Sequence, residues 1–167
     1  MTASTDLPTF CDWMLKNAKE EHQRAGQTAP TIAVLGRTGR VAVYKMRHRP
    51  DASLRMHSPA IIGMLREIDG WALVFYTECW TSEITMKNRP GIHVDDIPRP
   101  REMPDRGEAV RVLAITEDGE YRAQLSMIRR GAFGSSFEDG PVVTQLPGGE
   151  AWGGSTSEWF TQLLAAK

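Results

Sequence analysis

The stretch WALVFYTECWT, residues 71–81, decides the fold that the rest of the sequence predicts. Alternate residues of a β-strand point to opposite faces of a sheet. One face would carry Trp71, Leu73, Phe75, Thr77 and Cys79, and the other Ala72, Val74, Tyr76, Glu78 and Trp80. Both sets are largely apolar, which is typical of a central strand that is covered on both sides.

Two β-hairpins are predicted on either side of this strand. In the first, TIAVLGRTGRVAVYKM at residues 31–46, two β-branched runs surround two glycines that can supply the positive φ of a tight turn. The second, AVRVLAITEDGEYRAQLSMIRR at residues 109–130, turns at Asp118-Gly119. Its apolar and polar residues alternate after the turn, so one face is expected to meet water. Residues 131–154 are rich in Gly and Pro, and only a short strand at 142–146 is expected there.

Three helices complete the pattern. The first is predicted over residues 9–24, with AKEEHQR (18–24) on its exposed side and Gly26 as its end. The second is predicted to begin at Ser58-Pro59, with Ser58 as the N-cap, and to end at Asp69-Gly70. The last follows a capping-box pattern formed by Ser155 and Glu158.

The predicted order is therefore α-β-β-α-β-β-β-α. Tight hairpins produce antiparallel pairs, so the sequence predicts an α+β fold with one mainly antiparallel sheet of about five strands and three helices. A chain of 167 residues suits one domain, and residues 1–167 are assigned to it.

Composition narrows the possible functions. The formal net charge of −1 argues against a protein that coats nucleic acid, because such proteins carry an excess of basic residues. No signal peptide or membrane-spanning run is recognised in the sequence. The two cysteines, Cys11 and Cys79, lie in apolar patterns without CxxC spacing and are expected to be free, buried thiols in the cytoplasm. We expect no cofactor and no metal site of a recognised type.

A long segment, residues 82–108, separates two predicted strands. It contains four prolines and mixed charges, and a connection of this length in a compact domain tends to be functional or disordered. Proline-rich backbone loses little entropy when it docks, so the segment could be a recognition arm or an arm that clasps a second subunit. It could equally pack across its own domain through six apolar residues: Ile84, Met86, Ile92, Val94, Ile97 and Met103.

Candidate catalytic residues lie in and beside this segment. Glu78 sits near the end of the predicted central strand, and His93, Asp95 and Asp96 follow in the loop. Carboxylates with an imidazole can hold a divalent metal that activates water. The four residues show no recognised spacing, so they define only a candidate site.

A basic stretch at the start of the second helix is a candidate anion site. Its residues are Arg47, His48, Arg49, His57 and Ser58. Free N–H groups and the helix dipole favour an anion at a helix N-terminus. A solvated basic loop is the alternative interpretation.

These features favour a non-catalytic protein that binds a protein partner or binds itself as a homodimer. The alternative is a small metal- or acid-assisted hydrolase that uses Glu78, His93 and the loop carboxylates. No complete catalytic constellation is visible in the sequence, which is why the non-enzymatic hypothesis is preferred.

Overall fold

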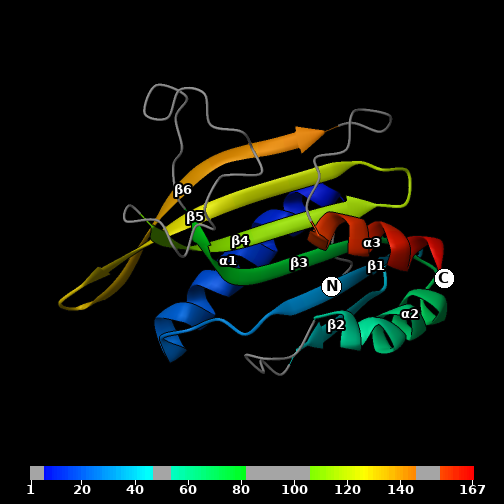
Figure 1. Ribbon diagram of the computed structural model, residues 1–167, viewed down its shortest axis with the longest axis horizontal. Coiled ribbons are helices and arrows are strands. Elements are labelled where there is room, and N and C mark those ends of the chain that lie inside the picture. The colour runs from blue at the N-terminus through cyan, green and yellow to red at the C-terminus, as the bar shows by residue number, and fades with distance from the viewer. Residues whose placement is uncertain (1–5, 47–53, 82–105, 146–154) are drawn as a thin grey trace.

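A computed structural model describes residues 6–46, 54–81, 106–145 and 155–167. The helices are α1 (Leu7–Ala25), α2 (Ser58–Glu67) and α3 (Ser155–Ala165), with a 3-10 turn, η1 (Leu54–His57), before α2. The strands are β1 (Thr31–Gly36), β2 (Val41–Lys45), β3 (Gly70–Thr81), β4 (Gly107–Thr116), β5 (Tyr121–Gly131) and β6 (Gly134–Gln145). Figure 1 shows their arrangement.

The strands form one antiparallel sheet in the order β2-β1-β3-β4-β5-β6. The α+β class and the order of elements are confirmed, but the described sheet has six strands where about five were expected. The difference is β6, which begins well before the short strand expected at 142–146. Gly140 and Pro141 lie within it, and β6 tolerates the proline because it is an edge strand.

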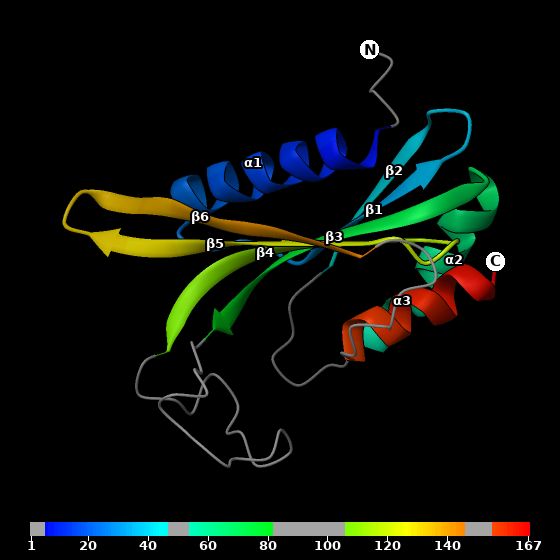
Figure 2. The same cartoon turned by 90° about the horizontal axis from the view of Figure 1, so that it is seen from above.

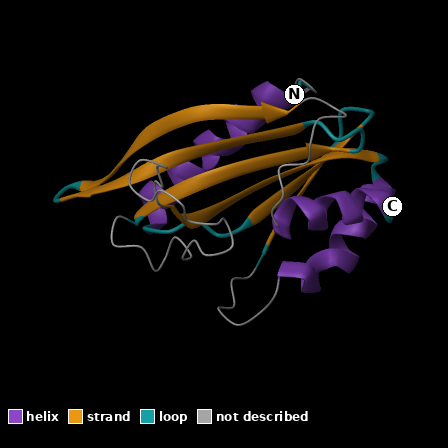
Figure 3. Ribbon diagram, turned by 45° about the horizontal axis from the view of Figure 1, so that its top comes forward, coloured by secondary structure: helices purple, strands orange, loops and turns teal. Residues whose placement is uncertain are grey.

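Helices cover both faces of the sheet, as Figures 2 and 3 show. On one face, α1 packs over the Ala72, Val74 and Tyr76 side chains of β3. On the other face, α2 and α3 pack over Leu73 and Phe75. The expectation that the central strand is covered on both sides is therefore confirmed over this part of β3. None of the described helices is both long enough and apolar enough to cross a membrane.

Local signals explain most of the helix boundaries. Asp6 caps α1, since its carboxylate accepts a hydrogen bond from the Thr9 backbone N–H at 3.2 Å. Gly26 ends α1 in the left-handed conformation with φ of 73°. The predicted N-cap of α2 was wrong by one residue: His57 occupies that position, and Ser58 is the first helical residue. The Ser58 hydroxyl instead donates to the Arg55 carbonyl and accepts from the indole N–H of Trp159.

The polar residues of β5 do not form its exposed face. Ser126 is completely buried beneath α1, where its hydroxyl bonds to the Asp139 carboxylate, and Arg122 forms an ion pair with Asp12 of α1. The apolar residues on the opposite face, Tyr121, Ala123, Leu125 and Met127, are only half-buried. Among the described elements, α2 and α3 therefore leave part of their sheet face uncovered.

Two glycines provide a matched test of the packing. A Cβ at Gly36, the last residue of β1, would lie 2.4 Å from the backbone oxygen of Ile68. Gly63 in the middle of α2 has nothing within 4 Å of a Cβ. We expect Gly36→Ala to lower the free energy of unfolding by about 1–3 kcal/mol through overpacking. Gly63→Ala should raise it by roughly 0.5–1 kcal/mol, because alanine favours a helix interior.

Urea unfolding of the two variants checks this expectation against the unmodified protein. Gly63→Ala is the control for the added methyl group. An equal change in both variants would contradict the close approach of Ile68 to Gly36.

Candidate functional site

Strand β3 extends past its neighbour β1. The first residue of β1, Thr31, pairs with Tyr76, whereas β3 continues to Thr81. Residues 77–81 pair with β4 on one side, from Thr77 opposite Arg111 to Thr81 opposite Gly107. On the other side, no described strand pairs with these five residues.

Strand geometry identifies the backbone groups on this open edge. Successive residues of an antiparallel strand direct their N–H and C=O groups to opposite neighbours. The backbone N–H of Gly36 donates to the Arg40 carbonyl at the β1–β2 turn, so Gly36 directs its groups toward β2. Thr31, five residues earlier, therefore directs its N–H and C=O groups toward β3, where Tyr76 is its partner. By the same alternation, the next groups of β3 that point away from β4 belong to Glu78 and Trp80. Among the described residues, the Thr77 hydroxyl donates to the Glu78 carbonyl at 3.2 Å, and no backbone group bonds to this edge.

A cleft of about 940 Å³ lies along the open edge. Its walls come from the end of α1, the chain that leads into β1, the end of β2, and strands β3 and β4. The described lining residues include three carboxylates and one ammonium group. The lining residues are Glu21, Ala25, Gln27, Thr28, Ala29, Pro30, Lys45, Met46, Thr77, Glu78, Cys79, Trp80 and Glu108.

Glu21 is fixed in one wall of this cleft by three donors. Its carboxylate accepts from Lys45 at 2.5 Å, from the Tyr76 hydroxyl at 2.9 Å and from the Ala29 backbone N–H at 3.5 Å. Burial by itself raises the pKa of Glu21, but the three hydrogen bonds outweigh burial and hold this pKa below its ordinary value. The carboxylate therefore remains ionised at neutral pH and contributes a fixed negative charge.

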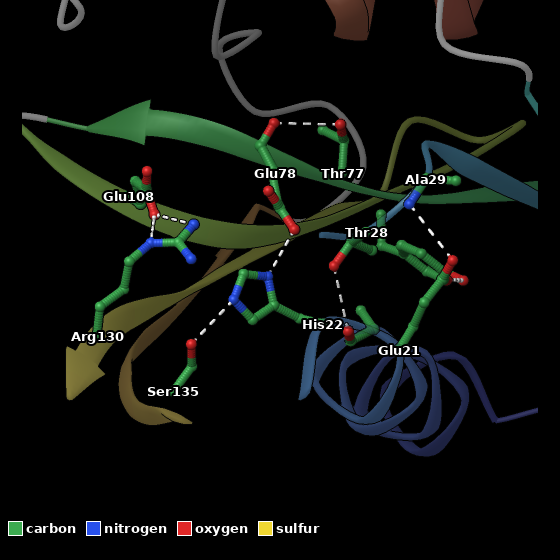
Figure 4. Close-up of polar contacts among 11 residues, drawn as sticks. Glu21, His22, Thr28, Ala29, Thr77, Glu78, Glu108, Arg130 and Ser135 are labelled. Carbon is green, nitrogen blue, oxygen red and sulfur yellow. Dashed lines mark hydrogen bonds and ion pairs between the residues drawn. The ribbon is translucent and has the colours of Figure 1, made fainter. Parts of the chain in front are cut away.

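A second polar chain joins α1, β3 and β6, as Figure 4 shows. The Nδ1 atom of His22 lies 2.7 Å from Oε1 of Glu78, and its Nε2 atom lies 3.2 Å from the Ser135 hydroxyl. Because an ionised carboxylate can only accept, a hydrogen bond from His22 to the ionised form of Glu78 requires a proton on Nδ1. The His22 side chain is completely buried, whereas Glu78 remains partly exposed.

His22 is the member of this polar chain that the sequence interpretation missed, since AKEEHQR was expected on the exposed side of α1. The expectation was wrong for His22 because β6 covers this end of the helix, and Phe137 of β6 meets the imidazole edge-on. Its spacing contained the signal: Met14, Ala18 and His22 follow one another at four-residue intervals, and all three are buried.

The other predicted catalytic residues are not brought to this site. Glu78 is in the cleft, but His93, Asp95 and Asp96 lie outside the described residues. Within the described parts of the chain, no group of three or more His, Cys, Asp or Glu side chains is arranged to hold a metal. The metal-assisted site remains a prediction.

The anion-site prediction is only partly visible. Arg47, His48 and Arg49 lie outside the described residues. His57 and Ser58 are described, and both are engaged within the protein: His57 Nδ1 lies 3.0 Å from the Tyr44 hydroxyl, and Ser58 contacts Arg55 and Trp159. Anion binding at the start of α2 stays a prediction.

Most of the long segment, residues 82–105, also lies outside the described residues. The predicted boundary at residue 108 was two residues late, since β4 begins at Gly107. The Arg106 guanidinium stacks on Trp80, with its Cζ atom 5.4 Å from the ring centroid. The described end of the segment therefore lies against β3.

Comparison of this chain with protein-family models, with curated proteins and with solved structures found no match.

The two thiols differ in exposure and provide a prediction. Cys11 is buried as expected, but Cys79, beside the cleft, is only partly buried. Burial raises the pKa of Cys11 to about 12 and also raises the pKa of Cys79. Because the thiolate is the reactive form, we expect both to react slowly with a disulfide reagent at neutral pH, Cys11 the more slowly.

Labelling rates of Cys11→Ser and Cys79→Ser, each with one remaining thiol, check this order. Both variants should react fully in concentrated urea. Rapid native labelling of Cys79 would contradict the suppression of its thiolate by burial.

Proposed function

We propose that this protein is a non-catalytic module that binds an extended segment of a protein partner along the open edge of β3. One observation carries the proposal. The backbone N–H and C=O groups of Glu78 and Trp80 point away from β4 toward the cleft, and no described strand pairs with them. An extended chain that is added to a sheet edge gains main-chain hydrogen bonds, and flanking pockets select its side chains. The cleft along residues 77–80 supplies such flanking space.

The charge of the cleft favours a partner segment with basic side chains. Among the described lining residues, three carboxylates (Glu21, Glu78 and Glu108) stand against the ammonium group of Lys45, and Glu108 is also paired with Arg130 of β5. Two copies joined through this edge would bring their carboxylates together, and like charges placed opposite each other destabilise strand pairing. A different protein therefore fits this edge better than a homodimer does.

The proposed location is the cytoplasm, as expected from the sequence. Both cysteines are free thiols. Free thiols are typical of proteins that work in a reducing compartment.

Proline at position 80 tests the edge directly. Trp80→Pro removes an N–H group that points to the open edge and leaves the β3–β4 bonds at positions 79 and 81 in place. We expect extended peptides selected by display on the unmodified protein to carry basic residues at alternate positions. Their affinity for Trp80→Pro should fall by about tenfold or more, which corresponds to about 1.4 kcal/mol.

Trp80→Val is the matched control, because it loses the indole and keeps the N–H group. Amide hydrogen exchange on the unmodified protein gives a second readout: the N–H groups of Glu78 and Trp80 should become protected when a selected peptide binds. Equal binding to the proline variant together with unprotected amides would contradict the proposal, and sedimentation would reveal self-association instead.

A second candidate, a serine hydrolase, is favoured by the order of hydrogen bonds in the Ser135–His22–Glu78 chain. A nucleophile, a base and an orienting carboxylate are connected in this order in catalytic triads. In such a reaction, the Ser135 oxygen would add to an acyl carbon while its proton passes to Nε2 of His22 and the C=O electrons move onto oxygen. The C=O bond would re-form as the bond to the leaving alcohol or amine breaks, with the Nε2 proton passing to that group, and Glu78 would hold the Nδ1 proton throughout. Against this candidate, Ser135 does not line the cleft beside Glu78.

A fluorophosphonate probe separates the two candidates, because it modifies activated serines covalently. The neighbouring Ser136 is exposed and serves as an internal reference. We expect mass spectrometry to find no faster labelling of Ser135 than of Ser136. Rapid labelling of Ser135 that is lost in His22→Gln would support the hydrolase and overturn the non-catalytic proposal.

A further inference from the structure

A second hollow, the β5 groove, lies on the sheet face that α2 and α3 leave open. It has a volume of about 730 Å³. Half-buried apolar side chains of β5, with Pro141 and Val143 of β6, form much of its lining. Three arginines also line it, namely Arg106, Arg111 and Arg129.

Two of these arginines have partners. Arg129 binds the Glu138 carboxylate through Nε and Nη2, at 3.2 and 2.9 Å. Arg106 stacks on the indole of Trp80. Their guanidinium groups are therefore engaged at the border of the β5 groove.

Arg111 differs from both. Its place in the β4 ladder puts it between Thr77 of β3 and Leu125 of β5. Its Nε atom is buried and has no hydrogen-bond partner, and no carboxylate among the described residues forms an ion pair with it. A buried N–H group of a charged side chain without an acceptor is unfavourable, so the arrangement calls for an acceptor from outside the described fold.

We propose that Arg111 is the receptor for a single carboxylate, carried by an aspartate or glutamate of an extended protein partner. A guanidinium presents parallel N–H groups that match the two oxygens of a carboxylate. The apolar lining beside it, including Leu125 and Met127, receives apolar side chains that flank the acidic residue on the same face of the partner strand. Within the described part of this apolar groove, the buried Nε atom of Arg111 has no acceptor, and one guanidinium fits one carboxylate better than it fits a run of phosphates.

This site is independent of the proposed function at the edge of β3. Glu78 belongs to the face of β3 that contacts α1, whereas Arg111 belongs to the opposite face of the sheet. The two surfaces also select opposite charges. A failure at one of them leaves the other testable.

The probe is the blocked peptide acetyl-Ser-Leu-Ser-Glu-Ser-Leu-Ser-amide, compared with its glutamine counterpart. In an extended chain, its leucines and glutamate share one face. Titration calorimetry on the full chain should show that the glutamate peptide binds about tenfold more tightly. Arg111→Met keeps an apolar stem in the groove and should bind both peptides equally.

Arg122→Met is the matched control, because Arg122 lies on the opposite face of the same sheet and pairs with Asp12. This variant should retain the preference for glutamate. Equal binding of the two peptides to the unmodified protein, absence of binding, or a preference that survives in Arg111→Met would overturn the proposal.

Discussion

The constraint on which the structure depends is that β3 is apolar on both faces and must be covered on both. Ala72, Val74 and Phe75 are completely buried between α1 on one side and α2 with α3 on the other. Removing apolar surface from water is the main favourable contribution to folding, so this strand fixes where the helices pack. The helices cover only part of a strand that is twelve residues long, and the uncovered end of β3 is where both candidate surfaces begin.

The change from apolar to polar packing along β3 is gradual and follows the path of α1. Toward the end of that helix, Glu21 and His22 reach Tyr76 and Glu78 through hydrogen bonds. A polar group that leaves water must find a partner, and these side chains supply partners to one another. The contacts that complete the packing of α1 therefore also hold the carboxylates of Glu21 and Glu78 beside the open edge of β3, where no described strand pairs with it.

The sequence predicts the parts of the fold that depend on local signals. The hairpin glycines, the helix end at Gly26 and the double apolar pattern of residues 71–81 each depend on neighbours in the chain. Strand β6 was largely missed because Gly134, Gly140 and Pro141 disfavour strands locally, while pairing with β5 overrides that preference. The role of His22 depends on Glu78 and Ser135, which are 56 and 113 residues away, so a local pattern could indicate its burial but not its partners.

Arg111 could not be identified from its sequence at all, because the absence of a partner among the described residues depends on the register of three strands. Thr77 lies opposite Arg111 in the β3–β4 ladder, and Glu78 lies opposite Val110. Glu78 and Arg111 therefore occupy neighbouring pairs of the ladder, and their side chains still emerge on opposite faces of the sheet because successive residues alternate. A carboxylate and a guanidinium that are close along the ladder are thus prevented from neutralising each other. Glu78 can bind His22 beneath α1, while Arg111 remains available in the β5 groove.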